Sequence, residues 1–390
     1  MTKSIYLKAG KENRVLSGHP WIFSSDLDWA EKAVSPGDVV SVVSNRGKHL
    51  GQAVYNPKSQ ISLRMLTYHE EMIDTAFIKN RVREAVALRR QISDLNCCRL
   101  INAESDRLPA VIADSFNGVI SLQCLSLGMA RFQDAIVEAL VEELHPMGIW
   151  ERNDVPVRAL EGMEQSTGLL YGKMPDRVEI SENGLKMLVD VRRGQKTGYF
   201  LDQKENRAAI APYSRSARML DICTHTGSFA LHAAMYGAAE VTGVDLSEYA
   251  LEGARENARL NGFDQAVFTA ANAFDFLREQ SDRGETYDLI VLDPPAFAKN
   301  KASLPGAIKG YKEINLRAMK MLKNGGVLVT CSCSQAMLPD LFRDTLNSAA
   351  ADARVTLQQL EWRGQGRDHP TLPAAEETRY LKCVILRVLR

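Results

Sequence analysis

The C-terminal half of the chain alternates between short apolar runs and longer stretches with helical spacing of apolar residues. Apolar runs bounded by turn residues predict buried strands, and the stretches between them predict helices of roughly ten to fifteen residues. The predicted strands are residues 219–223, 240–245, 266–270, 288–292, 327–331, 357–362 and 381–388. This alternation indicates an α/β fold with a doubly wound, mostly parallel sheet, whose last strand can run antiparallel because no helix precedes it.

The N-terminal region shows a different pattern, with short β-like runs separated by turn residues. The runs are residues 39–43, 49–55 and 61–66, and the turns are Pro36-Gly37, Asn45-Arg46-Gly47 and Asn56-Pro57. This pattern predicts a small β-barrel.

A helical pattern begins near Asp74, with apolar residues on one side and arginines mostly on the other. The arginines are Arg81, Arg83, Arg89 and Arg90. Two alternating strands follow, about residues 111–113 and 119–125, and then a helix about residues 131–144. We therefore predict a central α+β domain. The three predicted domains are residues 1–73, 74–184 and 185–390.

Composition narrows the class of protein. A chain of 390 residues with 45% hydrophobic content exceeds what one core usually organises. Its 48 basic and 48 acidic residues cancel, so any contact with nucleic acid needs a local basic cluster. Seven cysteines without regular spacing predict neither a disulfide framework nor a metal site. No apolar run approaches a membrane span and the start has no secretory h-region, so we expect a cytoplasmic protein.

The first predicted strand of the α/β region ends in a Rossmann-like turn. Asp221 lies in the last part of this strand, and His225, Thr226 and Gly227 lead directly into a helix. A glycine in such a turn lets a ligand approach the backbone N–H groups of the helix N-terminus. His225 can equally be turn filler without a role in binding.

Polar residues also follow the next two predicted strands. Asp245, followed by Leu246, ends the second strand, where a carboxylate can accept hydrogen bonds from both hydroxyls of a ribose. Asn272 and Ala273 follow the third strand, and the Asn272 amide oxygen can accept an N–H from adenine. The chain has no GxGxxG motif, so a dinucleotide is the less favoured ligand.

The fourth and fifth strands end in candidate catalytic residues. Strand 288–292 runs into Asp293-Pro294-Pro295-Ala296-Phe297, and two prolines fix a rigid turn beside the carboxylate. Strand 327–331, entered from a turn at Gly325-Gly326, ends with Cys331 and Cys333. Because sites in open α/β sheets lie at the carboxyl ends of strands, these thiols are placed as a nucleophile would be. Small cysteines can equally fill the core there.

Several motifs resemble one family over nearly the whole chain. Residues 17–23 and 51–61 look like an N-terminal PUA domain, which binds structured RNA. The other matching segments are residues 99–109, 196–203, 293–297, 310–315, 332–334, 368–370 and 380–382. The chain resembles the bacterial 23S ribosomal RNA cytosine-C5 methyltransferases, with a PUA domain, a central domain and a class I methyltransferase domain. The resemblance implies S-adenosylmethionine (AdoMet) as cofactor, 23S ribosomal RNA as partner, and Gln203 in the segment that leads to the cofactor.

The chain also departs from the expected patterns. Cys223 and His225 stand where AdoMet enzymes typically carry the first two glycines of D-x-G-x-G-x-G, and Asn272 stands where they typically carry an acid. Ala296 separates the prolines from Phe297, whereas enzymes that methylate amino groups place an aromatic residue directly after them. This last difference, together with a cysteine at the end of the following strand, favours a pyrimidine carbon as the target.

Carbon 5 of cytosine is too weak a nucleophile to take a methyl group unaided. A thiolate that adds to C6 makes C5 enamine-like, so covalent catalysis replaces one hard step by easier ones. The resemblance assigns this thiol to Cys333, with Cys331 as the second candidate. Asp293, if it carries a proton, can donate a hydrogen bond to N3. The sequence does not identify the base that removes H5.

Residues 299–323 are rich in lysine and arginine and have one acid, Glu313. Such a run is often a solvated face, but beside a base pocket it favours contact with phosphates. The predicted substrate-binding residues are Pro294, Phe297, Lys299, Lys309, Tyr311, Lys312 and Lys196. Two other functions stay open, a guanine-N7 ribosomal RNA methyltransferase and a non-catalytic RNA-binding assembly factor, and so does a homodimer.

Overall fold

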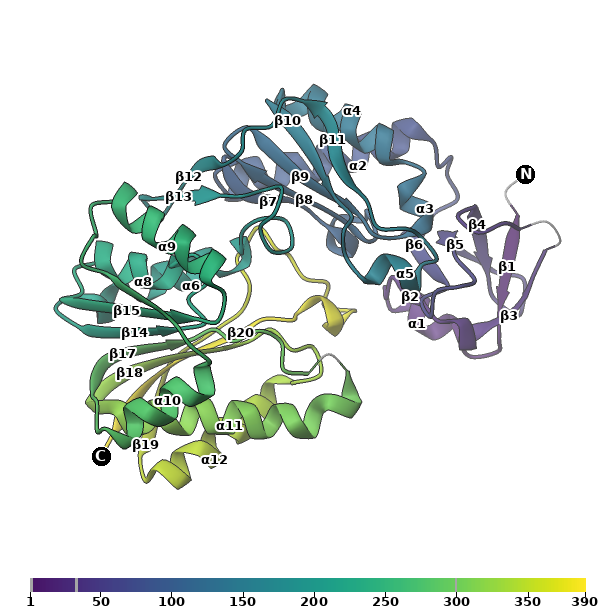
Figure 1. Cartoon of the computed structure of the whole chain (residues 1–390). Helices are drawn as coiled ribbons and strands as arrows, with labels where there is room; N and C mark the ends of the chain where they lie inside the picture. The colour runs from purple at the N-terminus through teal and green to yellow at the C-terminus, as the bar shows by residue number, and fades with distance from the viewer. Residues whose placement is uncertain (1–2, 32–33, 299) are drawn as a thin grey trace. The chain divides into compact units, whose positions relative to one another are not determined.

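The computed structural model describes residues 3–31, 34–298 and 300–390 (Figure 1). The chain divides into two compact units. The first unit holds residues 1–180, 189–202 and 367–378, and the second holds residues 181–188, 203–366 and 379–390. Both units are therefore built from segments that are distant in the sequence.

The N-terminal part of the first unit is a six-stranded sheet in the order β2-β6-β5-β4-β1-β3. Its strands are β1 (Ser4–Leu7), β2 (Trp21–Ile22), β3 (Leu27–Ala30), β4 (Val39–Val43), β5 (His49–Tyr55) and β6 (Leu63–Thr67), and α1 is Glu12–Leu16. The predicted strands at 39–43 and 49–55 are confirmed. Ile5, Val40, Ala53 and Leu63 belong to its hydrophobic core, because alternate residues of these strands face inward.

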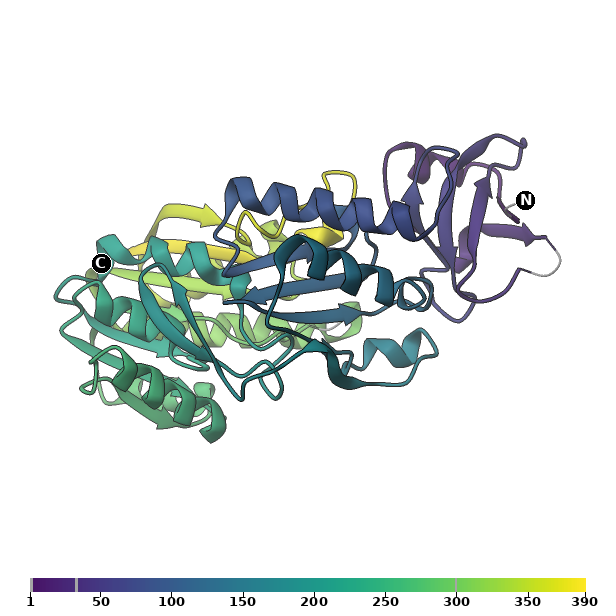
Figure 2. The same cartoon turned by 90° about the horizontal axis from the view of Figure 1, so that it is seen from above.

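The central part of the first unit is a five-stranded sheet in the order β11-β10-β9-β8-β7. Its strands are β7 (Cys97–Asn102), β8 (Val111–Phe116), β9 (Val119–Cys124), β10 (Gly148–Arg152) and β11 (Thr167–Gly172). The helices are α2 (Thr75–Ile92), α3 (Leu127–Ala130), α4 (Gln133–Leu144) and α5 (Val157–Leu160). Asp74 caps α2 by accepting the Phe77 N–H, and α2 is the long helix in the upper part of Figure 2.

Arg89 corrects the predicted polar face of α2. Its side chain is fully buried and forms an ion pair with Asp106 at 2.6 Å. Its remaining N–H groups donate to the carbonyl oxygens of Arg99 and Asp368 at 2.9 Å each. The helix is covered on this side by segments far away in the sequence, so charge alone could not tell which arginines face water.

The hairpin of β12 (Val178–Glu182) and β13 (Leu185–Val189) forms a separate two-stranded sheet. In the second unit, Arg207 lies buried against it and forms an ion pair with Glu182 at 2.6 Å. Arg207 belongs to α6 (Lys204–Ala209), which is followed by α7 (Ala211–Ser214).

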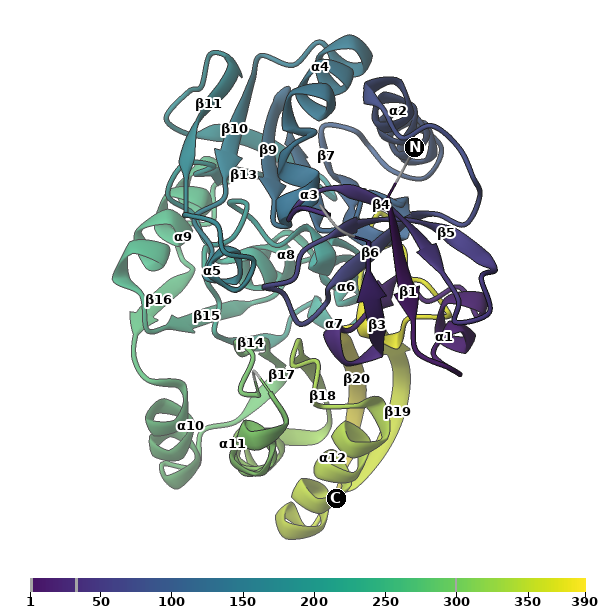
Figure 3. The ribbon, with the colours of Figure 1, turned by 90° about the vertical axis from the view of Figure 1, so that its right-hand side faces the viewer.

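The second unit is built on a seven-stranded sheet in the order β16-β15-β14-β17-β18-β20-β19, visible in Figure 3. The strands are β14 (Arg218–Ile222), β15 (Glu240–Asp245), β16 (Val267–Ala270), β17 (Tyr287–Leu292), β18 (Leu322–Ser332), β19 (Thr356–Arg363) and β20 (Lys382–Leu389). The first five are parallel, and β20 runs antiparallel to both neighbours, β18 and β19. The predicted doubly wound sheet is confirmed.

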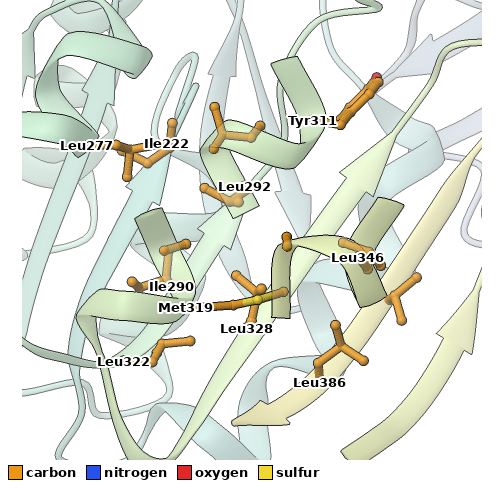
Figure 4. Close-up of a cluster of buried hydrophobic side chains, with 14 of the residues drawn as sticks. Ile222, Leu277, Ile290, Leu292, Tyr311, Met319, Leu322, Leu328, Leu346 and Leu386 are labelled. Atoms are coloured by element: carbon orange, nitrogen blue, oxygen red, sulfur yellow. The ribbon is translucent and has the colours of Figure 1, made fainter. Parts of the chain in front are cut away.

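Helices cover both faces of this sheet (Figure 1). They are α8 (Ser228–Met235), α9 (Glu248–Leu260), α10 (Ala273–Asp282), α11 (Leu304–Met321) and α12 (Pro339–Ala353). Figure 4 shows the apolar core in which side chains of β17, β18 and β20 pack against those of α11 and α12. Gly325 and Gly326 lie inside β18, at an irregularity of its pairing with β17, and not in a turn before the strand as predicted.

Candidate active site

The loop after β14 has a backbone that suits glycine, although glycine occupies only its last special position. Cys223, His225 and Gly227 have φ values of 63°, 52° and 82°. The left-handed conformation is unfavourable for residues with a Cβ, so the surrounding structure must impose it at Cys223 and His225. The loop therefore keeps the conformation of a glycine-rich turn, even where two of the expected glycines are absent.

The Asp221 carboxylate holds this loop in place through hydrogen bonds. Its Oδ2 accepts the Thr224 hydroxyl at 2.5 Å and the Ala230 N–H, in the first turns of α8, at 3.1 Å. Its Oδ1 is buried with no hydrogen-bond partner. Burial raises the pKa of Asp221 to about 7, and the negative charges of Asp293 and Asp245 add to the shift.

Asp245 presents a fixed carboxylate at the end of β15. Its Oδ2 accepts the His225 N–H at 2.9 Å, and its Oδ1 accepts the Ser247 N–H at 2.9 Å. Because each carboxylate oxygen has two acceptor positions, both oxygens can accept a further hydrogen bond from a ligand. Leu246 is 74% exposed beside it and offers an apolar surface.

Asn272 is less available than the sequence suggests. It is exposed and caps α10, with its Oδ1 accepting the N–H groups of Phe274 at 2.9 Å and Asp275 at 3.4 Å. The oxygen that was predicted to accept an adenine N–H therefore already satisfies the helix terminus. Ala273 is the first residue of that helix.

Asp293 follows β17 directly, beside the carboxyl end of β14. Its N–H donates to the Ile222 carbonyl oxygen at 3.2 Å, and its Oδ1 accepts the Gln203 amide N–H at 2.9 Å. The Gln203 amide oxygen accepts an N–H from Asn206 at 2.6 Å, which fixes the orientation of the amide. The structure thus brings Gln203 and Asp293 together.

The two thiols at the end of β18 differ in their surroundings. Cys331 is fully buried inside the strand, opposite Cys383 in β20, and this neighbour together with burial raises its pKa. Cys333 lies just past the strand, is partly exposed, and places its Sγ 3.9 Å from the Pro294 carbonyl oxygen. The more accessible thiol therefore lies against the turn that carries Asp293.

Ser334, the residue after Cys333, contacts three residues that are distant in the sequence. Its Oγ accepts the Ala298 N–H at 3.1 Å and lies 3.0 Å from the Tyr311 hydroxyl of α11. Its carbonyl oxygen accepts a hydrogen bond from Lys382 of β20 at 2.8 Å. The sequence motif around Lys382 supported the family resemblance, but it gave no sign that this side chain reaches the thiol segment.

Tyr311 and Lys312, both predicted to bind substrate, have contacts inside the protein. Tyr311 is fully buried, and its ring centroid lies 4.7 Å from that of Phe297. Lys312 forms an ion pair with Asp352 at 2.7 Å. Tyr311 therefore contacts Ser334 and Phe297 inside the protein, and the positive charge of Lys312 is partly neutralised.

The basic side chains of residues 299–323 differ in whether they are paired with acids. Lys309 is exposed on α11, whereas Arg317 and Lys323 form ion pairs with acids. Phe297 is partly exposed and Pro294 is buried. Lys299 lies outside the described residues.

Lys196 belongs to a loop of the first unit. It is exposed, and its Nζ lies 4.9 Å from the ring centroid of Phe200. The adjacent Thr197 donates its hydroxyl to Asp114 of β8 at 2.6 Å, and Arg152 of β10 donates to the Gly194 carbonyl oxygen at 2.7 Å. Two strands of the central sheet therefore hold this loop by hydrogen bonds, β10 at Gly194 and β8 at Thr197.

The described residues offer neither a cluster of metal ligands nor a membrane-spanning helix. They contain no group of three or more His, Cys, Asp or Glu residues that could hold a metal ion. No helix among them has both the length and the apolar character needed to cross a membrane.

Residues 159–387 match the family described as S-adenosylmethionine-dependent methyltransferase, and residues 5–68 match a PUA-like domain. The protein named ribosomal RNA large subunit methyltransferase I is 42% identical in Tolumonas auensis and 42% identical in Shewanella frigidimarina, with 100% of both chains covered in each case. A solved structure from Streptococcus mutans, described as a candidate methyltransferase of this class, has a TM-score of 0.85 at 20% identity and covers 99% of this chain and 100% of its own. It shows the fold alone. With the relatives matched over their full length, this chain belongs to the family of AdoMet-dependent ribosomal RNA large subunit methyltransferases I.

Proposed function

We propose that this protein methylates C5 of a cytosine in 23S ribosomal RNA and that Cys333 is the nucleophile. The observation that carries the proposal is the contrast between the two thiols at the end of β18. Cys333 is partly exposed against the Asp293-Pro294 turn, whereas Cys331 is sealed against Cys383. A methyltransferase for guanine N7 would need no thiol at this position.

The residues around the first three strands fit AdoMet. The left-handed turn at residues 223–227 lets a ligand approach the N-terminus of α8, and Asp245 holds a carboxylate for the ribose hydroxyls. Leu246 and Ala273 would border the adenine, with Asn272 at its edge and Thr226 in the turn. When bound, AdoMet supplies an electrophilic methyl group.

The residues at the ends of β17 and β18 would act on the base. The Cys333 thiolate adds to C6 of the cytosine and thereby raises electron density at C5. Gln203 holds one oxygen of Asp293 in place, so the carboxyl group has one orientation. Carrying a proton, it would donate to N3 and stabilise the adduct.

We assign RNA contact to the PUA-like region and to exposed side chains in each of the two units. Lys309 and Lys196 would meet phosphates, and Phe297 would stack on the extruded base, since enzymes that modify a base take it out of its stack. Because the substrate is ribosomal RNA, we place the reaction in the cytoplasm. The division at residues 73 and 184 stays our proposal for the functional domains.

Trapping with 5-fluorocytosine RNA tests the nucleophile. Fluorine at C5 cannot leave as a proton does, so the protein should stay bound to the RNA covalently after methyl transfer. Cys333→Ser should lose turnover and trapping, because an alcohol gives almost no anion at neutral pH, and it should still bind AdoMet. Cys331→Ser is the matched control and should retain both.

Each other outcome has a defined meaning. Activity in Cys333→Ser with none in Cys331→Ser would move the nucleophile to Cys331. Activity in both variants would refute the thiol mechanism, and digestion of the product with mass analysis would then show whether guanine carries the methyl group. RNA binding without any methylated nucleoside would indicate a non-catalytic assembly factor.

A further inference from the structure

Lys382 is a buried lysine at the start of β20, with 3% of its surface exposed. Its Nζ donates to the carbonyl oxygens of Ser334 at 2.8 Å and Tyr380 at 2.9 Å. Among the residues that the structure describes, no carboxylate forms an ion pair with it. A buried ammonium without a counter-charge is unfavourable. Because the side chain is also hidden from water, its role cannot be to make the surface soluble.

Two hydrogen bonds at Nζ leave one of its positions without a hydrogen-bond partner among the described residues. A neutral amine has two N–H groups and one lone pair, and the two carbonyl oxygens use both N–H groups. In the protonated form, a third N–H takes the place of the lone pair. Cys333 directly precedes Ser334, so the amine lies on the carbonyl oxygen of the residue next to the thiol.

The charge state of Lys382 suits proton exchange near neutral pH. Burial lowers the pKa of Lys382 to about 8, while a negative charge on Cys333 would raise it. Burial raises the pKa of the Tyr311 phenol in α11, and a negative charge on Cys333 would raise it further. Tyr311 therefore stays neutral. Asp293 of the neighbouring turn acts on Cys331. An amine of this kind can hold or release a proton under working conditions.

We infer that Lys382 activates Cys333 by accepting its thiol proton. The S–H bond breaks and an N–H bond forms, which converts a neutral thiol and a neutral amine into a thiolate and an ammonium with no change in total charge. The ammonium then stabilises the thiolate until it adds to the substrate. This inference rests on the proposed role of Cys333 and names the residue that prepares it for attack.

A purely structural role for Lys382 predicts something different. The two carbonyl bonds also clamp the thiol segment to β20, so loss of the side chain could disturb the position of Cys333 without affecting its ionisation. A disturbed position changes reactivity by the same factor at every pH. A lost proton acceptor raises the thiol pKa, so it lowers the rate at pH values below that pKa, and the difference disappears above it, where both thiols are ionised.

The test is the rate of Cys333 alkylation by iodoacetamide between pH 5.5 and 10, followed by mass spectrometry of the full-length protein. Lys382→Met keeps the length of the side chain and removes the amine. We expect it to lower the rate at pH 7 about tenfold, as a rise of about one unit in the thiol pKa would do, and to leave the rate at pH 10 unchanged. Lys382→Arg should keep the wild-type profile in part, because its charge still stabilises the thiolate.

Lys320→Met on the exposed end of α11 is the matched control and should change nothing. Lys382→Gln provides a second variant without charge should Lys382→Met fail to fold, and AdoMet calorimetry verifies folding of each variant. A profile that is unchanged, or lowered equally at all pH values, would overturn the inference. Failure of the proposed function appears separately, as methylation by Cys333→Ser.

Discussion

Replacement of Asp245 by alanine tests the cofactor site most directly. The carboxylate is held by the backbone N–H groups of His225 and Ser247, at 2.9 Å each, in an orientation that leaves an acceptor position on both oxygens. Hydrogen bonds to charged groups contribute about 1.5–3 kcal/mol each. Loss of two such bonds to the ribose should therefore weaken AdoMet binding by about 3–6 kcal/mol, from a hundredfold to more than about ten-thousandfold.

The same substitution also removes the two bonds within the protein. We expect a loss of about 3–6 kcal/mol in the free energy of unfolding, and a Tm lower by about 6–24 °C, with the transition still cooperative. Calorimetric titration with AdoMet gives the affinity, and thermal unfolding without ligand gives the stability. Measuring both separates a missing ligand contact from a damaged fold.

Two further variants sharpen the result. Asp264→Ala removes an exposed carboxylate from a turn of the same unit and should leave both quantities unchanged. Asp245→Asn keeps the volume and one acceptor oxygen, so it should fall between wild type and Asp245→Ala. Unchanged affinity in Asp245→Ala would refute the assignment of the ribose to β15, whatever happens to the Tm.

Three other substitutions test the electrostatics of the molecule. Lys309→Ala should weaken RNA binding and reduce the slope of log affinity against log salt by about 0.7–0.9, and a slope that stays constant would make Lys309 a solvated residue only. Asp221 has a pKa near 7 in the folded protein and 3.8 as its ordinary value, so stability should fall as pH rises between these values, and Asp221→Asn should remove that part of the pH dependence in thermal unfolding. Arg207→Met should lower the free energy of unfolding by about 3–5 kcal/mol in denaturant titration, because it leaves the Glu182 carboxylate buried without the Arg207 guanidinium. The double variant Arg207→Met with Glu182→Gln should recover much of this loss, because it removes the buried negative charge as well.

The sequence by itself determined the layout of the sheet in the second unit. Short apolar runs between turn residues can be buried as strands wherever they lie in the chain, so β15 was located to the residue and its neighbours to within a few residues. The two prolines after Asp293 cannot continue a strand ladder, and β17 ends at Leu292 just before this segment. Because the carboxyl ends of parallel strands share one edge of a sheet, the strand pattern alone was enough to place Asp221, Asp245 and Asp293 in one region.

Tertiary structure decided which side chains reach the site. Cys331 and Cys333 have the same local sequence signal, and only the pairing of β18 with β20 separates a sealed thiol from an accessible one. Burial of Arg89 by Asp106 and Asp368 depends on contacts between segments far apart in the chain, which no local pattern records.

Lys382 illustrates the same limit at the site itself. Nearly fifty residues separate it from Cys333 in the sequence. From its residue type alone, a lysine at the start of a strand is expected to face water. The antiparallel return of β20 beside β18 brings its amine to the Ser334 carbonyl oxygen and buries it there. Burial and neighbouring charge are properties of the folded chain, and they decide the ionisation of this amine where residue type alone would leave it a simple cation.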